Sequence, residues 1–221
     1  MTPLTTLIVP DGYDRKKGKP VTVIVWLHGM GSTPTGFVDP AAEDSLARAL
    51  ANELNVAFVG VSGTKVKGAD RFVWAENAEA DLARVTAALE EVKDRVTVTA
   101  GRVIAFGFSQ GAQTGFELAA RRPDLFAGAI VLSPGSDREN LGQIKEPSAL
   151  LKQRGFVFGC GAREHPGNKL QARNGAEWAK AAGAKVDNQL FPNQSAHSFP
   201  EDINARFPQW VTFVLAANEK K

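Results

Sequence analysis

The chain has 221 residues, of which 43% are hydrophobic and 23% are charged. This length is enough for one hydrophobic core, and the composition is that of a globular protein, so we expect a single domain over residues 1–221. Lys and Arg number 26 and Asp and Glu 24, and no run of basic residues concentrates the net charge of +2. The charge pattern therefore gives no indication of nucleic acid as a partner.

The cysteine content and the first residues bear on the compartment. Cys160 is the one cysteine, which excludes an intramolecular disulfide and fits a reducing compartment. The first residues show neither the basic nor the apolar part of a signal peptide, and no apolar run approaches the ~20 residues of a membrane span. We expect a cytoplasmic protein, or a secreted one whose signal peptide has been removed. It is expected to have no membrane span and to be a monomer or a homodimer.

Short apolar runs alternate along the chain with segments of helical periodicity. The runs predict strands at residues 21–27, 56–61, 102–108, 127–132, 155–160 and 186–191. Apolar spacings of three and four residues predict helices at 41–54, 76–93, 111–121 and 170–182, and a last one around 207–215. Strands that alternate with helices in this way form parallel βαβ units. The expected fold class is α/β, with a doubly wound and mostly parallel sheet, helices on both faces and no large lid domain.

A G-x-S-x-G pattern spans residues 107–111, directly after a predicted strand and directly before a predicted helix. In that context a tight turn lifts Ser109 out of the sheet, and its hydroxyl projects into a cleft. Gly107 and Gly111 supply the small residues that such a turn requires. The pattern predicts Ser109 as a nucleophile. The alternative is a serine that only caps the helix of an ordinary strand-to-helix turn.

A serine hydroxyl needs a base to take its proton, and in this arrangement the base follows the nucleophile in the chain. His28 precedes Ser109, which excludes it as the base. His165 precedes a predicted helix and lies too close in sequence to the candidate acids. His197 lies in a polar loop between the last predicted strand and the last predicted helix. We therefore predict His197 as the general base, against the alternative of an exposed loop histidine.

The acid that orients the base is expected in the loop after the penultimate strand. Glu164 is the one carboxylate in residues 159–166, which form that loop. Asp137, which follows the preceding strand, is its competitor. We favour Glu164 and keep Asp137 as the alternative.

The negative oxygen of a tetrahedral intermediate needs fixed N–H donors. One is expected to be the backbone N–H of Gln110, the residue after the nucleophile. The other is expected in residues 28–31, His-Gly-Met-Gly, where glycines on both sides let the amide of Met30 face the cleft. The alternative is a glycine-rich turn without a catalytic role.

The segments LHGMGS at residues 27–32 and GFSQGA at residues 107–112, together with a late histidine, resemble the α/β-hydrolase superfamily. Within it, the chain resembles the small carboxylesterase, lysophospholipase and acyl-protein thioesterase family. The segment VPDGYD at residues 9–14 is similar to feruloyl esterases and polyhydroxybutyrate depolymerases. The resemblance covers the chain from about Leu7 to Leu215. It implies a nucleophile at Ser109, a base at His197 and oxyanion amides at Met30 and Gln110.

The chain departs from that family at the acid. The family usually has Asp in a G-x-x-D loop, whereas residues 161–164 here read Gly-Ala-Arg-Glu. Glu164 is one methylene longer than the usual residue, and this leaves the assignment of the acid open between Glu164 and Asp137.

The substrate site is expected to be shallow and open, because the stretch where many relatives insert a helical lid, residues 133–155, is short here. Trp74, Phe37 and Phe199 lie in or beside the expected cleft loops and are candidates for an apolar pocket that binds the substrate. Packing in the core is the alternative for each of them. The sequence has neither a cluster with metal-ligand spacing nor a G-x-G-x-x-G after a strand, so we expect no metal and no cofactor.

The expected function is hydrolysis of small or medium carboxylic esters through an acyl-enzyme on Ser109, with a small-molecule or acyl ester as the substrate. The same chemistry could cleave a thioester or a peptide bond instead. A third hypothesis is a non-catalytic binding protein with the same fold, because a fold alone does not establish a function.

Overall fold

The computed structural model describes residues 5–17, 20–74, 77–135, 147–194 and 197–218. Nine strands are found in these segments: β1 (Thr5–Ile8), β2 (Thr22–Leu27), β3 (Val56–Val61), β4 (Thr64–Lys65), β5 (Phe72–Val73), β6 (Val103–Phe108), β7 (Phe126–Leu132), β8 (Gly155–Gly161) and β9 (Lys185–Phe191). The α-helices there are α1 (Leu46–Leu54), α2 (Ala78–Glu91), α3 (Gln110–Arg121), α4 (Pro166–Ala181) and α5 (Ile203–Ala216). Short 3-10 helices are η1 (Arg15–Lys17), η2 (Pro34–Gly36) and η4 (Ala149–Gln153).

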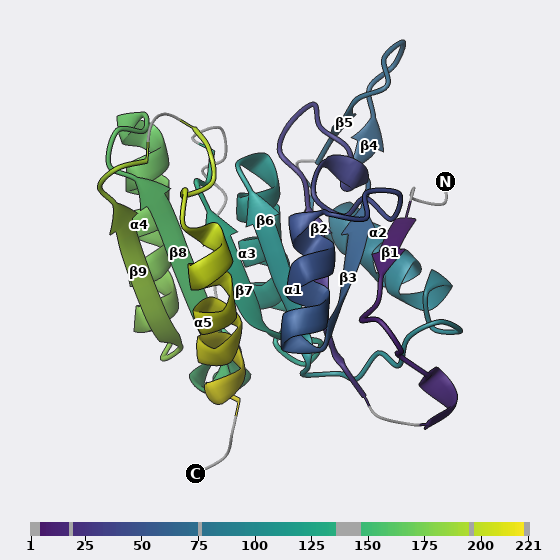
Figure 1. Cartoon of the computed structure of the whole chain (residues 1–221). Helices are drawn as coiled ribbons and strands as arrows, with labels where there is room; N and C mark the ends of the chain where they lie inside the picture. The colour runs from purple at the N-terminus through teal and green to yellow at the C-terminus, as the bar shows by residue number, and fades with distance from the viewer. Residues whose placement is uncertain (1–4, 18–19, 75–76, 136–146, 195–196, 219–221) are drawn as a thin grey trace.

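Seven of the strands form one sheet in the order β1-β3-β2-β6-β7-β8-β9 (Figure 1). β1 pairs with β3 in the antiparallel direction, and the other neighbours in this sheet are parallel. β4 and β5 form a separate antiparallel hairpin, which projects beyond the upper edge of the sheet in Figure 1. The predicted fold class, a doubly wound and mostly parallel α/β sheet, is confirmed.

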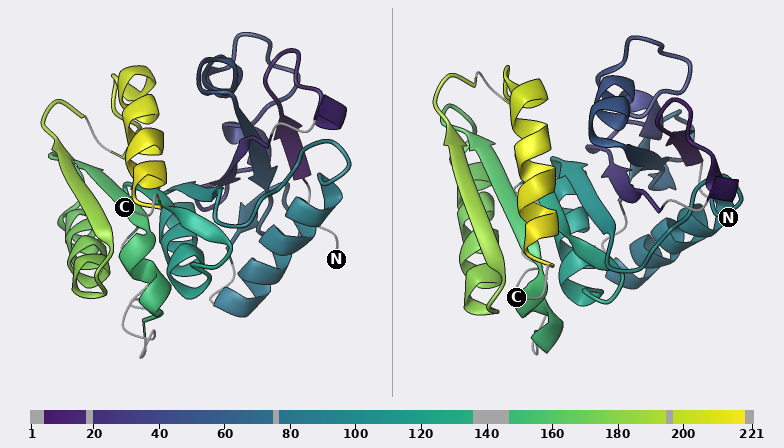
Figure 2. Two further views of the ribbon diagram at one scale, coloured as in Figure 1. Left: turned by 90° about the horizontal axis from the view of Figure 1, so that it is seen from below. Right: turned by 60° about the horizontal axis from the view of Figure 1, so that its bottom comes forward.

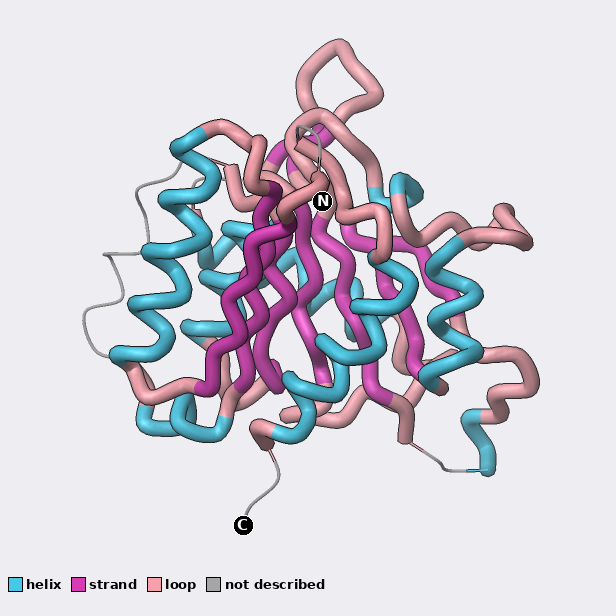
Figure 3. Tube along the Cα trace, turned by 60° about the vertical axis from the view of Figure 1, so that its left-hand side comes forward, coloured by secondary structure: helices cyan, strands magenta, loops and turns pink. Residues whose placement is uncertain are grey.

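Both faces of the sheet are covered by helices, because its central strands are apolar on both sides. In β2, Val23, Val25 and Leu27 belong to one buried cluster, which also contains residues of α2, α3 and α4. Ile24 and Trp26 of the same strand belong to a second buried cluster, with residues of α1 and α5. The layers are seen along the sheet in Figure 2, and Figure 3 shows the strands enclosed between the helices.

α1 and α4 begin several residues away from the positions that the periodicity predicts, and capping explains both differences. α1 begins at Leu46 instead of residue 41, because the Oγ of Ser45 accepts a hydrogen bond from the amide of Arg48 at 3.3 Å. α4 begins at Pro166 instead of residue 170, because proline suits the first helical position and His165 caps the helix. The earlier start of α4 matters for the site, since it brings the first turn of that helix next to Glu164.

The described residues contain no helix that is both long and apolar enough to cross a membrane. The same part of the chain contains no group of three or more His, Cys, Asp or Glu side chains that could hold a metal ion.

Candidate active site

Ser109 occupies a strained turn between β6 and α3. Its φ of 56° and ψ of −122° lie outside the regions that residues with a side chain commonly adopt. The surroundings enforce this conformation: a Cβ on Gly107 would lie 2.2 Å from the carbonyl oxygen of Gly111, and a Cβ on Gly111 would lie 2.0 Å from that of Leu27. The amide of Ser109 donates to the carbonyl of Leu132 at 3.1 Å, which fixes the turn to β7. The strand, the turn and the helix expected around Ser109 are therefore all present.

The loop after β2 lies directly against this turn. A Cβ built on Gly29 would lie 3.4 Å from the Cβ of Ser109, which is van der Waals contact, so the loop passes directly beside the serine. Neither the Met30 amide nor the Gln110 amide has an acceptor among the described residues. Gln110 is the first residue of α3, where the helix dipole is positive and the N–H has no partner within the helix. The role of these two amides as oxyanion donors stays a prediction.

A buried histidine fixes the loop of Met30, although the sequence reading gave it no function. His28 has no exposed surface, and its Nε2 accepts a hydrogen bond from the amide of Gly63 at 3.1 Å. Its Nδ1 lies 2.7 Å from the carbonyl oxygen of Gly29 and therefore carries the proton. The indole of Trp74 donates to the His28 carbonyl at 2.8 Å, and the Trp74 amide donates to Oε1 of Gln110 at 2.9 Å. These bonds tie the Met30 loop, the segment after β5 and the start of α3 together.

The burial of His28 predicts that the free energy of unfolding decreases on acidification. Burial lowers the pKa of His28 below the usual 6.5. The unfolded chain therefore binds a proton that the folded chain resists, so the stabilisation is present above about pH 6.5 and is lost as the pH falls below it. We expect His28→Asn to flatten the fall in unfolding free energy between about pH 7.5 and pH 5. At pH 7.5 the same change should cost about 1–3 kcal/mol, because hydrogen bonds of a buried ring are lost.

Chemical denaturation at several pH values measures this effect. The matched control is His165→Asn, since His165 is exposed and asparagine also caps helices well. The control should follow the wild-type curve. Equal pH slopes for the wild type and His28→Asn would show that His28 does not carry this dependence.

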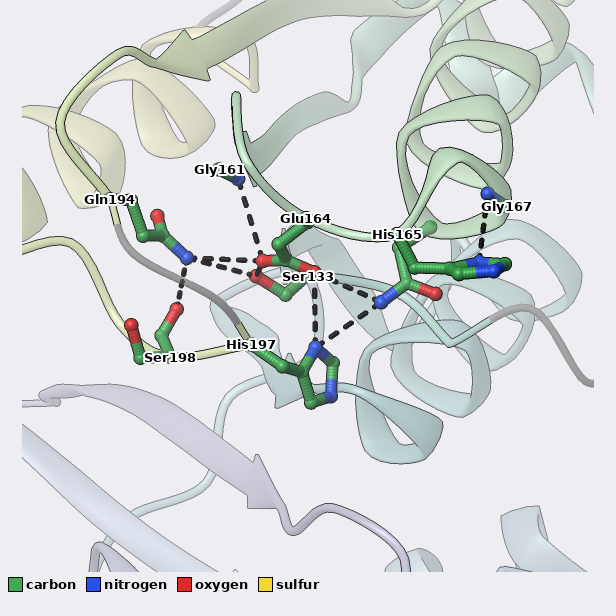
Figure 4. A network of polar contacts seen from close by, with 9 residues as sticks. Ser133, Gly161, Glu164, His165, Gly167, Gln194, His197 and Ser198 are labelled. Atoms are coloured by element: carbon green, nitrogen blue, oxygen red, sulfur yellow. Dashed lines mark hydrogen bonds and ion pairs between the residues drawn. The ribbon is translucent and has the colours of Figure 1, made fainter.

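Glu164 and His197 are joined by a hydrogen bond (Figure 4). They follow β8 and β9, so they lie at the carboxyl edge of the sheet, where Ser109 follows β6. Nδ1 of His197 lies 3.0 Å from Oε2 of Glu164. The carboxylate side chain has no exposed surface, whereas 41% of the imidazole is exposed. A carboxylate accepts this bond, so the proton resides on Nδ1 and the lone pair of Nε2 is free to act as a base.

The imidazole of His197 packs on Phe108, the residue that precedes Ser109, with 4.7 Å between the ring centroids. The predicted base and the predicted nucleophile thus lie in the same neighbourhood. The described residues show no hydrogen bond between Ser109 and His197, so direct proton transfer between them stays a prediction. Catalytic hydrogen bonds are often long in the absence of substrate. Asp137, the alternative acid, lies outside the described residues.

Glu164 is surrounded by hydrogen-bond donors. Ser133 donates to Oε1, as do Gln194 at 3.1 Å and the amide of Gly161 at 3.4 Å. Asn168 donates to Oε2 at 2.9 Å. Burial alone would raise the pKa of Glu164, but hydrogen bonds from His197, Asn168 and Ser133 outweigh it and hold the pKa below its usual value. Glu164 is therefore a carboxylate at neutral pH, as the orienting acid of a triad must be.

Ser133, Asn168 and Gln194 were not among the residues expected from the sequence. Asn168 lies one helical turn after Glu164, a spacing that could have indicated it once α4 was known to begin at Pro166. Ser133 and Gln194 reach Glu164 from segments 31 and 30 residues away, and no local pattern marks them.

Two of the three aromatic residues expected in a substrate pocket lie in the core. Trp74 is 2% exposed and Phe37 is 8% exposed, and each belongs to one of the two buried clusters. Their burial leaves little surface for a ligand, which corrects the expectation for both. Phe199 is only partly buried and contacts Phe108, with 4.9 Å between the ring centroids. A role in substrate binding stays a prediction for Phe199.

Comparisons with known proteins show the family to which the chain belongs. The sequence model of the alpha/beta hydrolase family matches residues 24–218. Feruloyl esterase C of Emericella nidulans is 32% identical over 136 residues, which are 58% of this chain and 45% of that protein, so the match spans less than half of the relative.

Solved structures resemble the whole chain. A ferulic acid esterase has a TM-score of 0.73 at 15% identity, over 96% of this chain and 92% of its own. A Bacillus cereus carboxylesterase has a TM-score of 0.69 at 15% identity, over 96% of this chain and 94% of its own. Identities this low show a shared fold and no more, whereas the family match covers most of the sequence. The chain therefore belongs to the alpha/beta hydrolase family.

Proposed function

We propose that this protein is a serine esterase, which hydrolyses carboxylic esters through an acyl-enzyme on Ser109. His197 is the general base and Glu164 the acid that orients it. The observation that carries the proposal is the bond from Nδ1 of His197 to the buried carboxylate of Glu164, at the sheet edge where Ser109 is held in a strained turn. A serine that only caps a helix would require neither the strain nor the charged partner of the histidine.

In the first half of the reaction, Oγ of Ser109 attacks the carbonyl carbon of the ester while Nε2 of His197 takes the hydroxyl proton. The electron pair of the carbonyl moves to its oxygen, which becomes an oxyanion. The backbone N–H groups of Met30 and Gln110 donate to this oxyanion, and such donors are each worth about 3–4 kcal/mol of barrier. The intermediate then collapses, the bond to the alcohol oxygen breaks, and the alcohol leaves with the proton from His197.

In the second half, water attacks the acyl carbon and gives a proton to Nε2 of His197. The bond to Oγ of Ser109 breaks, Ser109 regains its proton and the carboxylic acid leaves. Glu164 remains ionised throughout and stabilises the imidazolium that forms twice in each cycle. The hydrogen bonds that keep the pKa of Glu164 low suit this role, because a protonated acid would not stabilise the cation.

The comparisons favour an ester as the substrate. The printed names of the similar proteins describe feruloyl and ferulic acid esterases and a carboxylesterase. The partly exposed Phe199, beside Phe108 and the imidazole, offers an apolar contact for an acyl or aromatic group.

The test is a series of p-nitrophenyl esters from acetate to palmitate, assayed beside the matching thioesters. We expect the esters to be hydrolysed with a burst of p-nitrophenol, because acylation of Ser109 should precede slower deacylation. Ser109→Ala is the control and should show no burst. If the thioesters are cleaved far faster than the matching esters at every chain length, the protein is a thioesterase and the esterase hypothesis is wrong. Absence of turnover with all substrates would favour a binding protein.

A further inference from the structure

Two buried amide side chains lie on either side of Glu164 and have no part in the reaction described above. Asn168, in the first turn of α4, is 8% exposed, and Gln194, in the loop after β9, is 3% exposed. Asn168 donates to Oε2 of Glu164, and Gln194 donates to Oε1. Each oxygen of the carboxylate is therefore held by an amide from a different part of the chain.

We propose that Asn168 and Gln194 are positioning residues, which hold the Glu164 carboxylate and the His197 imidazole in the geometry that proton transfer requires. This inference rests on the proposed function, since it concerns the same acid and base. Among the described residues, the two amides bond neither to Ser109 nor to Nε2 of His197, and they act through Glu164 and through the loop of His197.

Asn168 sets the direction in which the carboxylate presents its oxygen. Its Nδ2 lies 2.9 Å from Oε2, the oxygen that also accepts from His197, and 3.2 Å from Nδ1 of the imidazole. Both nitrogens are donors, so their proximity is explained by the oxygen that they share. A glutamate side chain has several rotatable bonds, and this second donor restricts their freedom.

Gln194 connects the acid to the loop of the base. Besides Oε1 of Glu164, its Nε2 contacts Oγ of Ser133 at 3.4 Å and the carbonyl oxygen of Ser198. Ser198 directly follows His197, so one amide group holds the backbone beside the base and the carboxylate that charges it. Figure 4 shows the amide nitrogen of Gln194 joined both to Ser198 and to the carboxylate of Glu164, with His197 below Glu164.

The hydrogen bonds of the Gln194 side chain are all made by its nitrogen. Its Oε1 is buried and has no hydrogen-bond partner among the described residues. A buried acceptor without a partner costs about 1–3 kcal/mol, so what this side chain contributes comes from the bonds of its Nε2. The glutamine is accounted for by what its Nε2 holds in place.

The first test replaces each amide with an apolar side chain of similar size, as Asn168→Leu and Gln194→Met. We expect kcat on p-nitrophenyl acetate to fall by about tenfold to a hundredfold with KM changed by less than about twofold, because small misplacements of catalytic groups have effects of this size. Asn218→Leu is the matched control. It removes a partly buried amide that bonds to backbone carbonyls of β7 and α5, far from Glu164, and it should lower stability without lowering kcat.

The second readout is one that a purely structural role would not change. A carboxylate that has lost a donor holds the imidazolium more strongly, so the acidic limb of the kcat/KM profile should move to higher pH in Asn168→Leu. Other ionisable groups near this carboxylate are Cys160 of β8 and Lys169 of α4, whose Nζ bonds the Ala162 carbonyl. Burial and the charge of Glu164 raise the pKa of Cys160 to about 12, so its thiol stays neutral across the profile.

Proton NMR of the Nδ1–H of His197 tests the geometry without any substrate. We expect its downfield resonance to shift or broaden in both variants and to stay unchanged in the Asn218 control. Unchanged kcat, pH limb and resonance in folded variants would overturn the inference. Should either variant fail to fold, Gln194→Asn and Asn168→Ser, which keep polar groups on shorter side chains, should show the same losses in smaller measure.

Failure of the positioning role can be distinguished from failure of the proposed function. If wild-type protein reacts with a fluorophosphonate and the variants react equally fast, the positioning role is wrong and the serine hydrolase stands. If wild-type protein does not react, the proposed function is wrong, and the inference that rests on it is wrong as well.

Discussion

Replacing Ser109 by alanine is expected to lower kcat for ester hydrolysis by about 10⁴-fold or more, and His197→Ala should cost a similar factor. The two losses have one origin, because attack by Oγ and removal of its proton occur in the same step. The double variant should therefore be hardly slower than either single variant. Initial rates on p-nitrophenyl acetate, measured with the wild type and the three variants, give these numbers.

Stability separates loss of chemistry from loss of structure in these variants. Ser109 has a φ of 56°, which strains any residue with a side chain, so alanine should fold with nearly the same stability as serine. His197→Ala removes a half-exposed ring and should also fold. A folded Ser109→Ala protein with more than about a tenth of wild-type kcat would exclude Ser109 as the nucleophile.

Glu164→Gln is expected to lower kcat by about 10⁴-fold, comparable to removal of the acid charge in other triads. The structure gives a second reason for a large effect. Ser133, Gln194 and the Gly161 amide donate to one carboxylate oxygen, and Asn168 and His197 donate to the other. An amide at this position would direct its own N–H groups against one set of donors, so the side chain could not keep all of its bonds.

Asp137→Asn is the comparison that decides between the two candidate acids. With Glu164 as the acid, kcat of Asp137→Asn should remain within about threefold of wild type, because Asp137 would then take no part in the reaction. Near-normal activity of Glu164→Gln together with a severe loss in Asp137→Asn would reverse the assignment.

Much of the fold could be predicted because the hydrophobic pattern is regular. Runs such as residues 21–27 are apolar on both faces, and only a parallel sheet between helices buries both faces of such a strand. β1 and the β4–β5 hairpin were missed because they are short and partly polar, and β1 also pairs with β3, a partner distant in sequence. The start of α1 was misplaced because Ser45, and not the apolar spacing, determines it.

Part of the candidate site could likewise be predicted from the sequence, and part could not. Ser109 is marked by a local turn that requires glycines, and His197 by its place between the last strand and the last helix. The role of Gln194 depends on contacts across the fold, which no local pattern encodes. Trp74 and Phe37 were assigned to a substrate pocket because an aromatic residue in a loop near the site has the same sequence signature whether it binds substrate or fills the core.

Mapping of the covalent adduct formed with a fluorophosphonate is the most direct test of a nucleophilic Ser109 activated by His197. Mass spectrometry of the digested protein should place the added phosphonyl group on the peptide that carries Ser109. Labelling should be absent in Ser109→Ala and slowed by at least about a hundredfold in His197→Ala, because an unactivated serine is a weak nucleophile. A stable, folded wild-type protein that remains unlabelled, or that is labelled equally fast without His197, would contradict the account.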